Sequence, residues 1–148
     1  MKITKYLVSL VVLLYGIRVA ALPSAAEEAV LSAAEENLIC RFACAACGEE
    51  APLAAKLGVV NVILNRLADS RFPDTIAEVI FEGKFKCVED GTINDAFSES
   101  AAVSAADALF LARSGHDPTG GATFFAEKDD DFSRLGITFE AGRFVFGK

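Results

Sequence analysis

The stretch Leu57-Gly-Val-Val-Asn-Val-Ile-Leu64 decides how this chain folds, because nearly every side of a helix built from it is apolar. A helix that is apolar all round has to be covered by other parts of the protein, so we expect a buried central helix. This helix is predicted to span residues 52–67. Pro52 suits its first turn, where the missing backbone N–H of proline carries no cost. The rest of the chain must supply the elements that cover it.

Two further long helices are predicted, one before and one after this stretch. Residues 27–47 are rich in alanine and place their apolar side chains three and four positions apart, which is typical of an amphipathic helix. Gly48 is expected to end that helix. The third long helix is predicted to start after Ser98, a good N-terminal cap, and to reach Arg113, with Gly115 just beyond it.

The remaining segments predict shorter elements. Asp74 is expected to cap a short helix over residues 75–81, and residues 82–97 are expected to form a loop. A short strand is predicted at 123–125, and loose alternation over 136–146 indicates a small hairpin. The predicted fold class is therefore mainly α, of the α+β type, with a minor β-hairpin.

Length, composition and charge narrow the class of protein. The chain has 148 residues, which is enough for one domain. Hydrophobic residues make up 53% of the chain and charged residues 24%, which excludes a disordered protein. The net charge of -7 provides no cationic face for nucleic acid, so we expect no nucleic-acid partner.

Residues 1–26 are expected to be a signal peptide and not part of the fold. Two lysines precede an apolar run over residues 6–17, and small residues follow. This order is typical of a secretory signal, with cleavage after Ala21 or Ala26. The run is shorter than the roughly 20 residues of a spanning helix, and an uncleaved anchor is the alternative. We expect a secreted or cell-envelope monomer in which residues 27–148 form one domain, with no stable membrane span after cleavage.

The cysteines favour packing over metal binding. Cys40, Cys44 and Cys47 are spaced so that their sulfur atoms lie on one face of the first long helix. We expect buried thiols, with at most one bridge to Cys87, which an exported protein permits. Three ligands from one continuous helix make a poor zinc tetrahedron, and an iron–sulfur cluster with this spacing needs a far larger barrel.

His116 and an acidic segment near residue 130 are two further candidate functional sites. His116 could pair with a cysteine in a thiol peptidase that cuts cell-wall peptides, which is an alternative function. The cysteines near residue 47 lie at a helix C-terminus, however, where the dipole disfavours a reactive thiolate. Glu127 and residues 129–131 are acidic but are expected to form a solvated loop, so no metal and no cofactor is predicted.

Four segments, in order and with their spacing, carry a resemblance to a known family. They are Val62-Ile-Leu-Asn-Arg66, Arg71-Phe-Pro-Asp-Thr-Ile-Ala-Glu-Val-Ile80, Phe85-Lys-Cys-Val88 and Asp117-Pro-Thr-Gly-Gly-Ala122. Together they resemble the cell-wall hydrolases of the spore-cortex-lytic (SleB-like) type, over about residues 38–146. The resemblance implies a lysozyme-like, mostly helical single domain that cleaves peptidoglycan as a lytic transglycosylase or muramidase.

That reaction needs one carboxylic acid. The acid protonates the glycosidic oxygen, and the 6-hydroxyl of the muramyl sugar then takes the place of water, which gives an anhydro product. The second carboxylate of ordinary glycosidases can be absent. An acid that is to stay protonated near neutral pH needs a half-buried cleft, such as the end of a helix that faces a loop.

The chain departs from the family at the proton donor. The family motif reads Ala-Glu-Ala-x-Gly-Glu, and its first Glu is the catalytic acid. Residues 45–50 here read Ala-Ala-Cys-Gly-Glu-Glu, so the catalytic position falls on Ala45 or, aligned without gaps on the next helix, on Cys47. Glu50 and Glu49 are the candidate replacements, with Glu50 slightly favoured because it follows position 47 by three residues. A catalytically inactive, peptidoglycan-binding member of the family is the alternative.

Other residues are expected to contact the substrate. Phe85 is predicted to stack on a sugar face, with a place in the hydrophobic core as the alternative. Thr119, Gly120 and Gly121 are predicted to let backbone amides approach a glycan strand, with turn formation alone as the alternative reason for the glycines. Asn65 is expected to hold the loop beneath the cleft, which is a structural role more than a chemical one.

Overall fold

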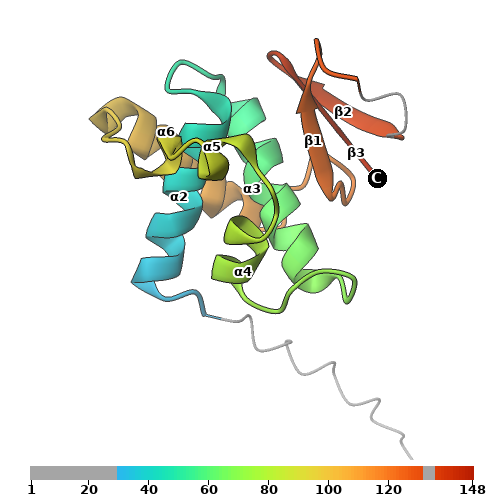
Figure 1. Cartoon of the computed structure of the whole chain (residues 1–148), viewed down its shortest axis with the longest axis horizontal. Helices are drawn as coiled ribbons and strands as arrows, with labels where there is room; N and C mark the ends of the chain where they lie inside the picture. Colours follow the sequence, from blue (N-terminus) through green and yellow to red (C-terminus); the bar gives the residue numbers. More distant parts are fainter. Residues whose placement is uncertain (1–29, 132–135) are drawn as a thin grey trace, which may run out of the picture. The chain divides into compact units, whose positions relative to one another are not determined.

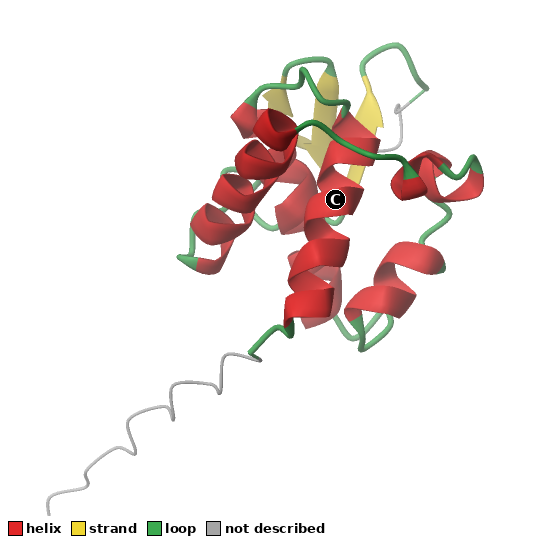
Figure 2. Ribbon diagram, turned by 90° about the vertical axis from the view of Figure 1, so that its left-hand side faces the viewer, coloured by secondary structure: helices red, strands yellow, loops and turns green. Residues whose placement is uncertain are grey.

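The computed structural model describes residues 30–131 and 136–148, so the predicted signal peptide lies outside the described residues. The described helices are α2 (Ala33–Cys47), α3 (Leu53–Ala68), α4 (Ile76–Phe81), α5 (Lys86–Glu89), the 3₁₀ helix η1 (Thr92–Asn94) and α6 (Glu99–Arg113). The strands are β1 (Phe124–Glu127), β2 (Ile137–Ala141) and β3 (Phe144–Gly147). Helices make up most of the described chain, and the strands lie together (Figures 1 and 2), which confirms the predicted fold class. None of the described helices is long and apolar enough to cross a membrane.

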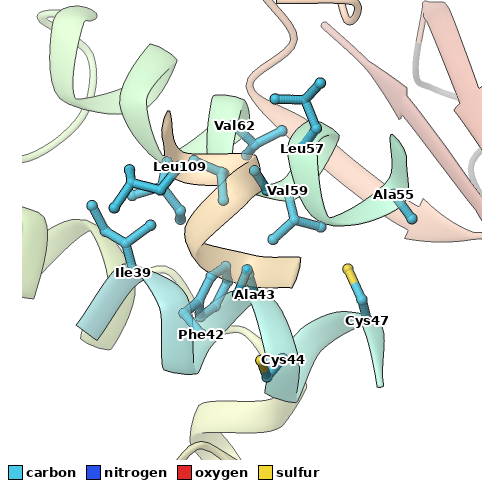
Figure 3. Packing of buried hydrophobic residues seen from close by; sticks show 14 of the residues in the cluster. Ile39, Phe42, Ala43, Cys44, Cys47, Ala55, Leu57, Val59, Val62 and Leu109 are labelled. Carbon is cyan, nitrogen blue, oxygen red and sulfur yellow. The ribbon is translucent and has the colours of Figure 1, made fainter. Parts of the chain in front are cut away.

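Helix α3 is buried as its sequence predicts. Every residue from Ala55 to Ile63 is buried, and Val59 and Val62 are fully enclosed. Helices α2 and α6 both pack against α3, and their side chains meet in one cluster (Figure 3). The one amide in this run is satisfied, because Asn61 Nδ2 donates to the carbonyl oxygens of Leu57 at 3.0 Å and His116 at 2.9 Å. The long helices therefore supply the cover that α3 requires.

Helix α2 begins later than the alanine-rich pattern predicts. Ser32 caps it through a capping box: Ser32 Oγ accepts from the backbone N–H of Glu35 at 3.2 Å, and Glu35 Oε2 accepts from the backbone N–H of Ser32 at 2.8 Å. Residues 30–32 are consequently not helical, and the predicted start at residue 27 is too early. The predicted end is confirmed, since the helix stops at Cys47 and Gly48 follows with φ of 88°.

The cap predicted for the short fourth helix is wrong by one residue. Thr75, not Asp74, accepts from the backbone N–H of Glu78, at 3.2 Å, and α4 runs over Ile76–Phe81. The cap predicted for α6 is confirmed, because Ser98 Oγ accepts from the backbone N–H of Ala101. Both positions obey the same rule, and a choice between neighbouring capping residues depends on the path of the incoming chain.

The loop predicted for residues 82–97 is wrong, because this segment contains α5 and η1. Burial explains the difference: Cys87 in α5 is 6% exposed and Ile93 in η1 is 3% exposed. The Arg41 side chain also donates two hydrogen bonds to the carbonyl oxygen of Ile93, at 3.2 and 3.0 Å, which fixes η1 against α2. These are tertiary contacts, so a local pattern could not have predicted them.

The three strands form one antiparallel sheet in the order β1-β3-β2. The hairpin predicted at 136–146 is confirmed as β2 and β3, and the first strand adds to its far edge, which the sequence did not predict. The sheet packs against α3 at Gly58, where a Cβ atom would lie only 2.5 Å from Cζ of Phe146. A glycine inside the buried helix is therefore what permits the close approach of the sheet.

Candidate active site

A cleft of about 320 Å³ lies between the end of α2, the start of α5 and the sheet. Its floor is aromatic. The Phe85 and Phe125 rings stack with centroids 5.6 Å apart and planes at 13°, and Phe144 packs edge-on against Phe125 at 6.2 Å. Phe85 was predicted to face the substrate, and it does line this cleft.

The polar lining of the cleft carries both signs of charge. Its acids are Asp90, Glu127 and Asp130, and its bases are Lys84, Lys86 and Arg143. Arg143 Nη2 lies 3.5 Å from Glu127 Oε1. Hydrogen bonds from the side chain and backbone N–H of Thr92 lower the pKa of Asp90. An apolar floor with polar groups around it is the usual construction of a site for a small or oligomeric ligand.

Arg66 supports the aromatic floor from within the protein. Its guanidinium carbon lies 4.9, 4.7 and 5.1 Å from the ring centres of Phe72, Phe85 and Phe124. Its Nε atom donates to the carbonyl oxygen of Thr123 at 2.7 Å. The side chain is 6% exposed, and burial lowers the pKa of Arg66. The role is structural, because Arg66 fixes Phe85 and the start of β1 to α3.

Asn65 also has a structural role, in the turn at residues 117–121. Its Nδ2 atom donates to Asp117 Oδ2 at 3.1 Å and to the carbonyl oxygen of Ala122 at 2.9 Å. Burial acts to raise the pKa of Asp117, but hydrogen bonds from Thr119, Asn65 and Gly121 outweigh it, so this pKa lies below its ordinary value. The amide and the carboxylate together hold the turn at residues 117–121.

The glycine-containing turn lies apart from the cleft. Thr119 is fully buried, and its hydroxyl donates to Asp117 and accepts from the backbone N–H of Ala122. Gly120 and Gly121 have φ of 64° and 84°, a left-handed conformation that favours glycine. None of the three lines the cleft. The structure therefore places Phe85 at the cleft and these three predicted binding residues in a turn held by Asn65.

The end of α2 brings no acid to the cleft. The two α2 side chains that line it are Ala45 and Ala46. Cys47 instead packs in the core (Figure 3), where it is 3% exposed and burial raises the pKa of its thiol to about 12. Both positions to which the sequence assigned the catalytic acid are thus occupied by groups that cannot donate a proton near neutral pH.

Glu49 and Glu50 are exposed and line a neighbouring hollow of about 390 Å³. Glu49 is held at two points: its Oε1 accepts from the backbone N–H of Ser98 at 2.7 Å, and its carbonyl oxygen accepts from Lys56 Nζ at 3.1 Å. Glu50 makes no hydrogen bond or ion pair with any residue that the structure describes. Arg143 lines both this hollow and the main cleft, so the two depressions adjoin.

The cysteines lie in an environment that suppresses thiolate chemistry. All four are free thiols, and Cys44 Sγ donates to the carbonyl oxygen of Ala101 at 3.4 Å. Burial is the largest cause of a raised pKa at Cys40, Cys44 and Cys87 as well. His116 is exposed in the turn after α6. These observations speak against a cysteine peptidase, whose nucleophile needs a lowered thiol pKa.

No metal-binding group of three or more His, Cys, Asp or Glu side chains occurs in residues 30–131 and 136–148. The sheet contributes more residues to the cleft than the sequence predicts. Glu127 was assigned to a solvated loop, because the predicted strand ended at residue 125, whereas β1 continues to Glu127. The alternation of Phe125 and Glu127 was the available signal for a strand with both side chains on one face.

Several known proteins are similar to this chain in sequence. A family model described as Cell Wall Hydrolase matches residues 50–146. A spore cortex-lytic enzyme from Halalkalibacterium halodurans is 42% identical over 79 residues, which cover 53% of this chain and 23% of that enzyme. A spore cortex-lytic enzyme from Bacillus cereus is 37% identical over 84 residues, which cover 56% of this chain and 31% of that enzyme. The chain thus spans less than a third of the length of these relatives.

Solved structures match over more of their length. The catalytic domain of the Bacillus cereus SleB protein superposes with a TM-score of 0.60 at 33% identity, covering 76% of this chain and 91% of that one. The catalytic domain of the germination-specific lytic transglycosylase SleB from Bacillus anthracis gives a TM-score of 0.67 at 27% identity, covering 81% and 98%. The lysozyme-like fold implied by the resemblance is confirmed, and this chain belongs to the cell wall hydrolase family, of the SleB-like type.

Proposed function

We propose that this chain binds the glycan strands of peptidoglycan in the cleft beside α2 and cleaves their glycosidic bonds. The observation that carries the proposal is the stacked pair Phe85 and Phe125, which forms an aromatic floor in a cleft of about 320 Å³ at the end of α2. The relatives named spore cortex-lytic enzyme and lytic transglycosylase support the same substrate class.

A glycan strand suits this cleft on physical grounds. Sugar rings have apolar faces that pack on aromatic side chains, and their hydroxyl and acetamido groups need polar partners at the edges. Phe85 and Phe125 offer the first, and Lys84, Asp90 and Arg143 offer the second.

Glu50 is our candidate for the proton donor, in a reaction that uses a single general acid. Glu49 already accepts a hydrogen bond from Ser98 and ties the α2–α3 loop to the start of α6, whereas Glu50 has no such engagement with a described residue. Its proton would pass to the glycosidic oxygen as the C1–O bond breaks, and the muramyl 6-hydroxyl or water would then attack C1.

The export of the chain is part of the proposal. Residues 1–26 would direct it across a membrane, with cleavage after Ala21 or Ala26, and residues 27–148 would act as a secreted or cell-envelope monomer. Peptidoglycan lies in that compartment, so the predicted signal and the proposed substrate agree.

A second function, binding without cleavage, is favoured by one observation. Ala45 and Ala46 are the side chains that α2 brings to the cleft, in place of the acid of the family motif. An inactive member would keep the aromatic floor and lose the chemistry.

The experiment is digestion of purified sacculi, with separation of the soluble products. The proposal predicts glycan fragments with anhydro or reducing muramyl ends, and their loss in Glu50→Gln. Glu49→Gln tests the other loop glutamate, and full cleavage by both variants removes these residues from the mechanism. Sedimentation of intact protein with undigested sacculi would instead identify a binding protein.

A further inference from the structure

The cleft contains a carboxylate of its own, on the sheet side. Glu127 is the last residue of β1, two positions after Phe125, and residues two apart in a strand project from the same face. Its partner across the ladder is Phe144. Both phenylalanines line the cleft, as does Glu127 itself. The strand geometry therefore directs this carboxylate into the cleft that the two alanines of α2 also line.

The other two acids of the cleft each accept hydrogen bonds that shape a turn. Asp90 accepts from the backbone N–H of Thr92 at 2.9 Å and from its hydroxyl, which shapes the turn before η1. Asp130 Oδ2 accepts from the backbone N–H of Glu127 at 3.3 Å and so shapes the turn after β1. Asp90 and Asp130 are exposed, whereas Glu127 is partly buried. Glu127 is the cleft acid whose side chain shapes no turn.

Arg143 orients Glu127 and supplies its counter-charge. Arg143 Nη2 lies 3.5 Å from Glu127 Oε1, and its guanidinium carbon lies 5.2 Å from the centre of the Phe144 ring. A carboxylate can accept a proton and can stabilise positive charge, which are the tasks of the second acid in ordinary glycosidases.

We propose that Glu127 is a second catalytic carboxylate, which acts on a glycan bound in this cleft. The inference rests on the proposed function. As the C1–O bond breaks, the proton donor protonates the leaving oxygen and positive charge develops at C1. The Glu127 carboxylate stabilises that charge and takes the proton from the attacking 6-hydroxyl or water as the new C1–O bond forms. Proton exchange with water then restores both carboxyl groups.

The proposal adds a catalytic group on the sheet side of a cleft whose α2 side carries only Ala45 and Ala46. The main cleft and the hollow that holds Glu50 share Arg143 and Phe144 as lining residues. A glycan strand that lies across both depressions would meet Glu127 in the main cleft and Glu50 in the neighbouring hollow. The sheet then contributes a catalytic group that the end of α2 does not.

The test compares Glu127→Gln with Glu140→Gln in digestion of purified sacculi. Glu140 lies on β2 and pairs with Lys128 at 3.0 Å, so it is a matched glutamate of the same sheet that is not among the cleft residues. We expect Glu127→Gln to lose at least about 100-fold in cleavage rate, a typical share for one general acid–base group. Binding to sacculi should change little, and Glu140→Gln should keep the wild-type rate.

Rescue with a small nucleophile separates chemistry from structure. In Glu127→Ala, added azide can replace the activated oxygen and should restore part of the rate, with an azide adduct on the released sugar. A residue with only a structural role would give no such adduct. If the Gln or Ala variant does not fold, Glu127→Asp is the substitute, because it retains the charge. Circular dichroism should verify that this variant is folded. We expect it to keep part of the activity.

The failures are distinguishable. Wild-type cleavage rates in Glu127→Gln overturn this inference and leave the proposed function intact. A wild-type protein that releases no glycan fragments overturns both. Loss of activity in Glu127→Gln with full activity in Glu50→Gln supports Glu127 and removes Glu50 as the donor.

Discussion

The guanidinium carbon of Arg66 lies 4.7 Å from the centre of the Phe85 ring, so the buried helix α3 holds the aromatic floor of the cleft in place. The same side chain donates to the carbonyl oxygen of Thr123, just before β1. One buried arginine thus fixes both the start of α5 and the start of β1, and both elements contribute lining residues to the cleft. The site depends on the core directly beneath it.

The first prediction concerns this arginine. Arg66→Met keeps much of the apolar volume but removes the donor to the buried Thr123 carbonyl, so we expect the free energy of unfolding to fall by about 1–3 kcal/mol. Urea denaturation measures it. Arg71→Gln is the control, because Arg71 is 72% exposed in its pair with Asp69 and should change stability by less than about 0.5 kcal/mol. Equal effects in the two variants would contradict the structural role of Arg66.

A second prediction uses the sign of a stability change at Gly58. In an open helix, Gly→Ala stabilises by about 1 kcal/mol. Here the new Cβ would lie 2.5 Å from Phe146 Cζ, so we expect a loss of about 1–3 kcal/mol instead, as in other overpacked cores. Thermal unfolding distinguishes the signs, and Ala54→Ser on the exposed side of α3 is the control. Stabilisation by Gly58→Ala would show that the sheet does not pack closely on α3.

A third prediction concerns stability at acid pH. The folded pKa of Asp117 lies below its ordinary value, so its contribution to stability is fully present above the unfolded pKa and is lost as pH falls through the folded pKa. The relevant window lies below about pH 4, the ordinary value for aspartate. Asp117→Asn should flatten the fall of Tm with pH in that window. An unchanged slope would contradict the role of the carboxylate in holding the turn.

A fourth prediction separates glycan cleavage from thiol chemistry. Burial raises the thiol pKa of Cys47 to about 12 and that of Cys87 to about 11, so both should resist iodoacetamide in the native protein at pH 8. Cys40, which is half-buried, should be alkylated first. Mass spectrometry of the treated protein measures this order. Loss of sacculus digestion after alkylation of the native protein would favour the peptidase alternative.

The sequence predicted those parts of the fold that depend on local patterns. The apolar run of α3, the Ser98 cap of α6 and the β2–β3 hairpin are confirmed, because composition and capping chemistry determine them within a few residues. The helices inside 82–97 were missed, because they depend on buried contacts with distant residues, such as that of Arg41 with Ile93.

The candidate site was likewise predictable from the sequence only in part. Phe85 was identified from its motif and does line the cleft. Glu127 is assigned to a loop by the sequence, because the predicted strand ends at residue 125. In the structure β1 continues to Glu127, which pairs with Phe144 of β3, about 17 positions later in the sequence. The alternation of Phe125 and Glu127 is a local sign of a longer strand, but the pairing with β3 joins distant segments, so the place of Glu127 in the cleft follows only from the folded chain.

The measurement that tests the central claim most directly is analysis of the products released from purified sacculi by the wild-type protein. Cleavage in the aromatic cleft predicts soluble glycan fragments with new anhydro or reducing muramyl ends and no new free amino groups. New free amino groups without new sugar ends, or no soluble product at all, would contradict it.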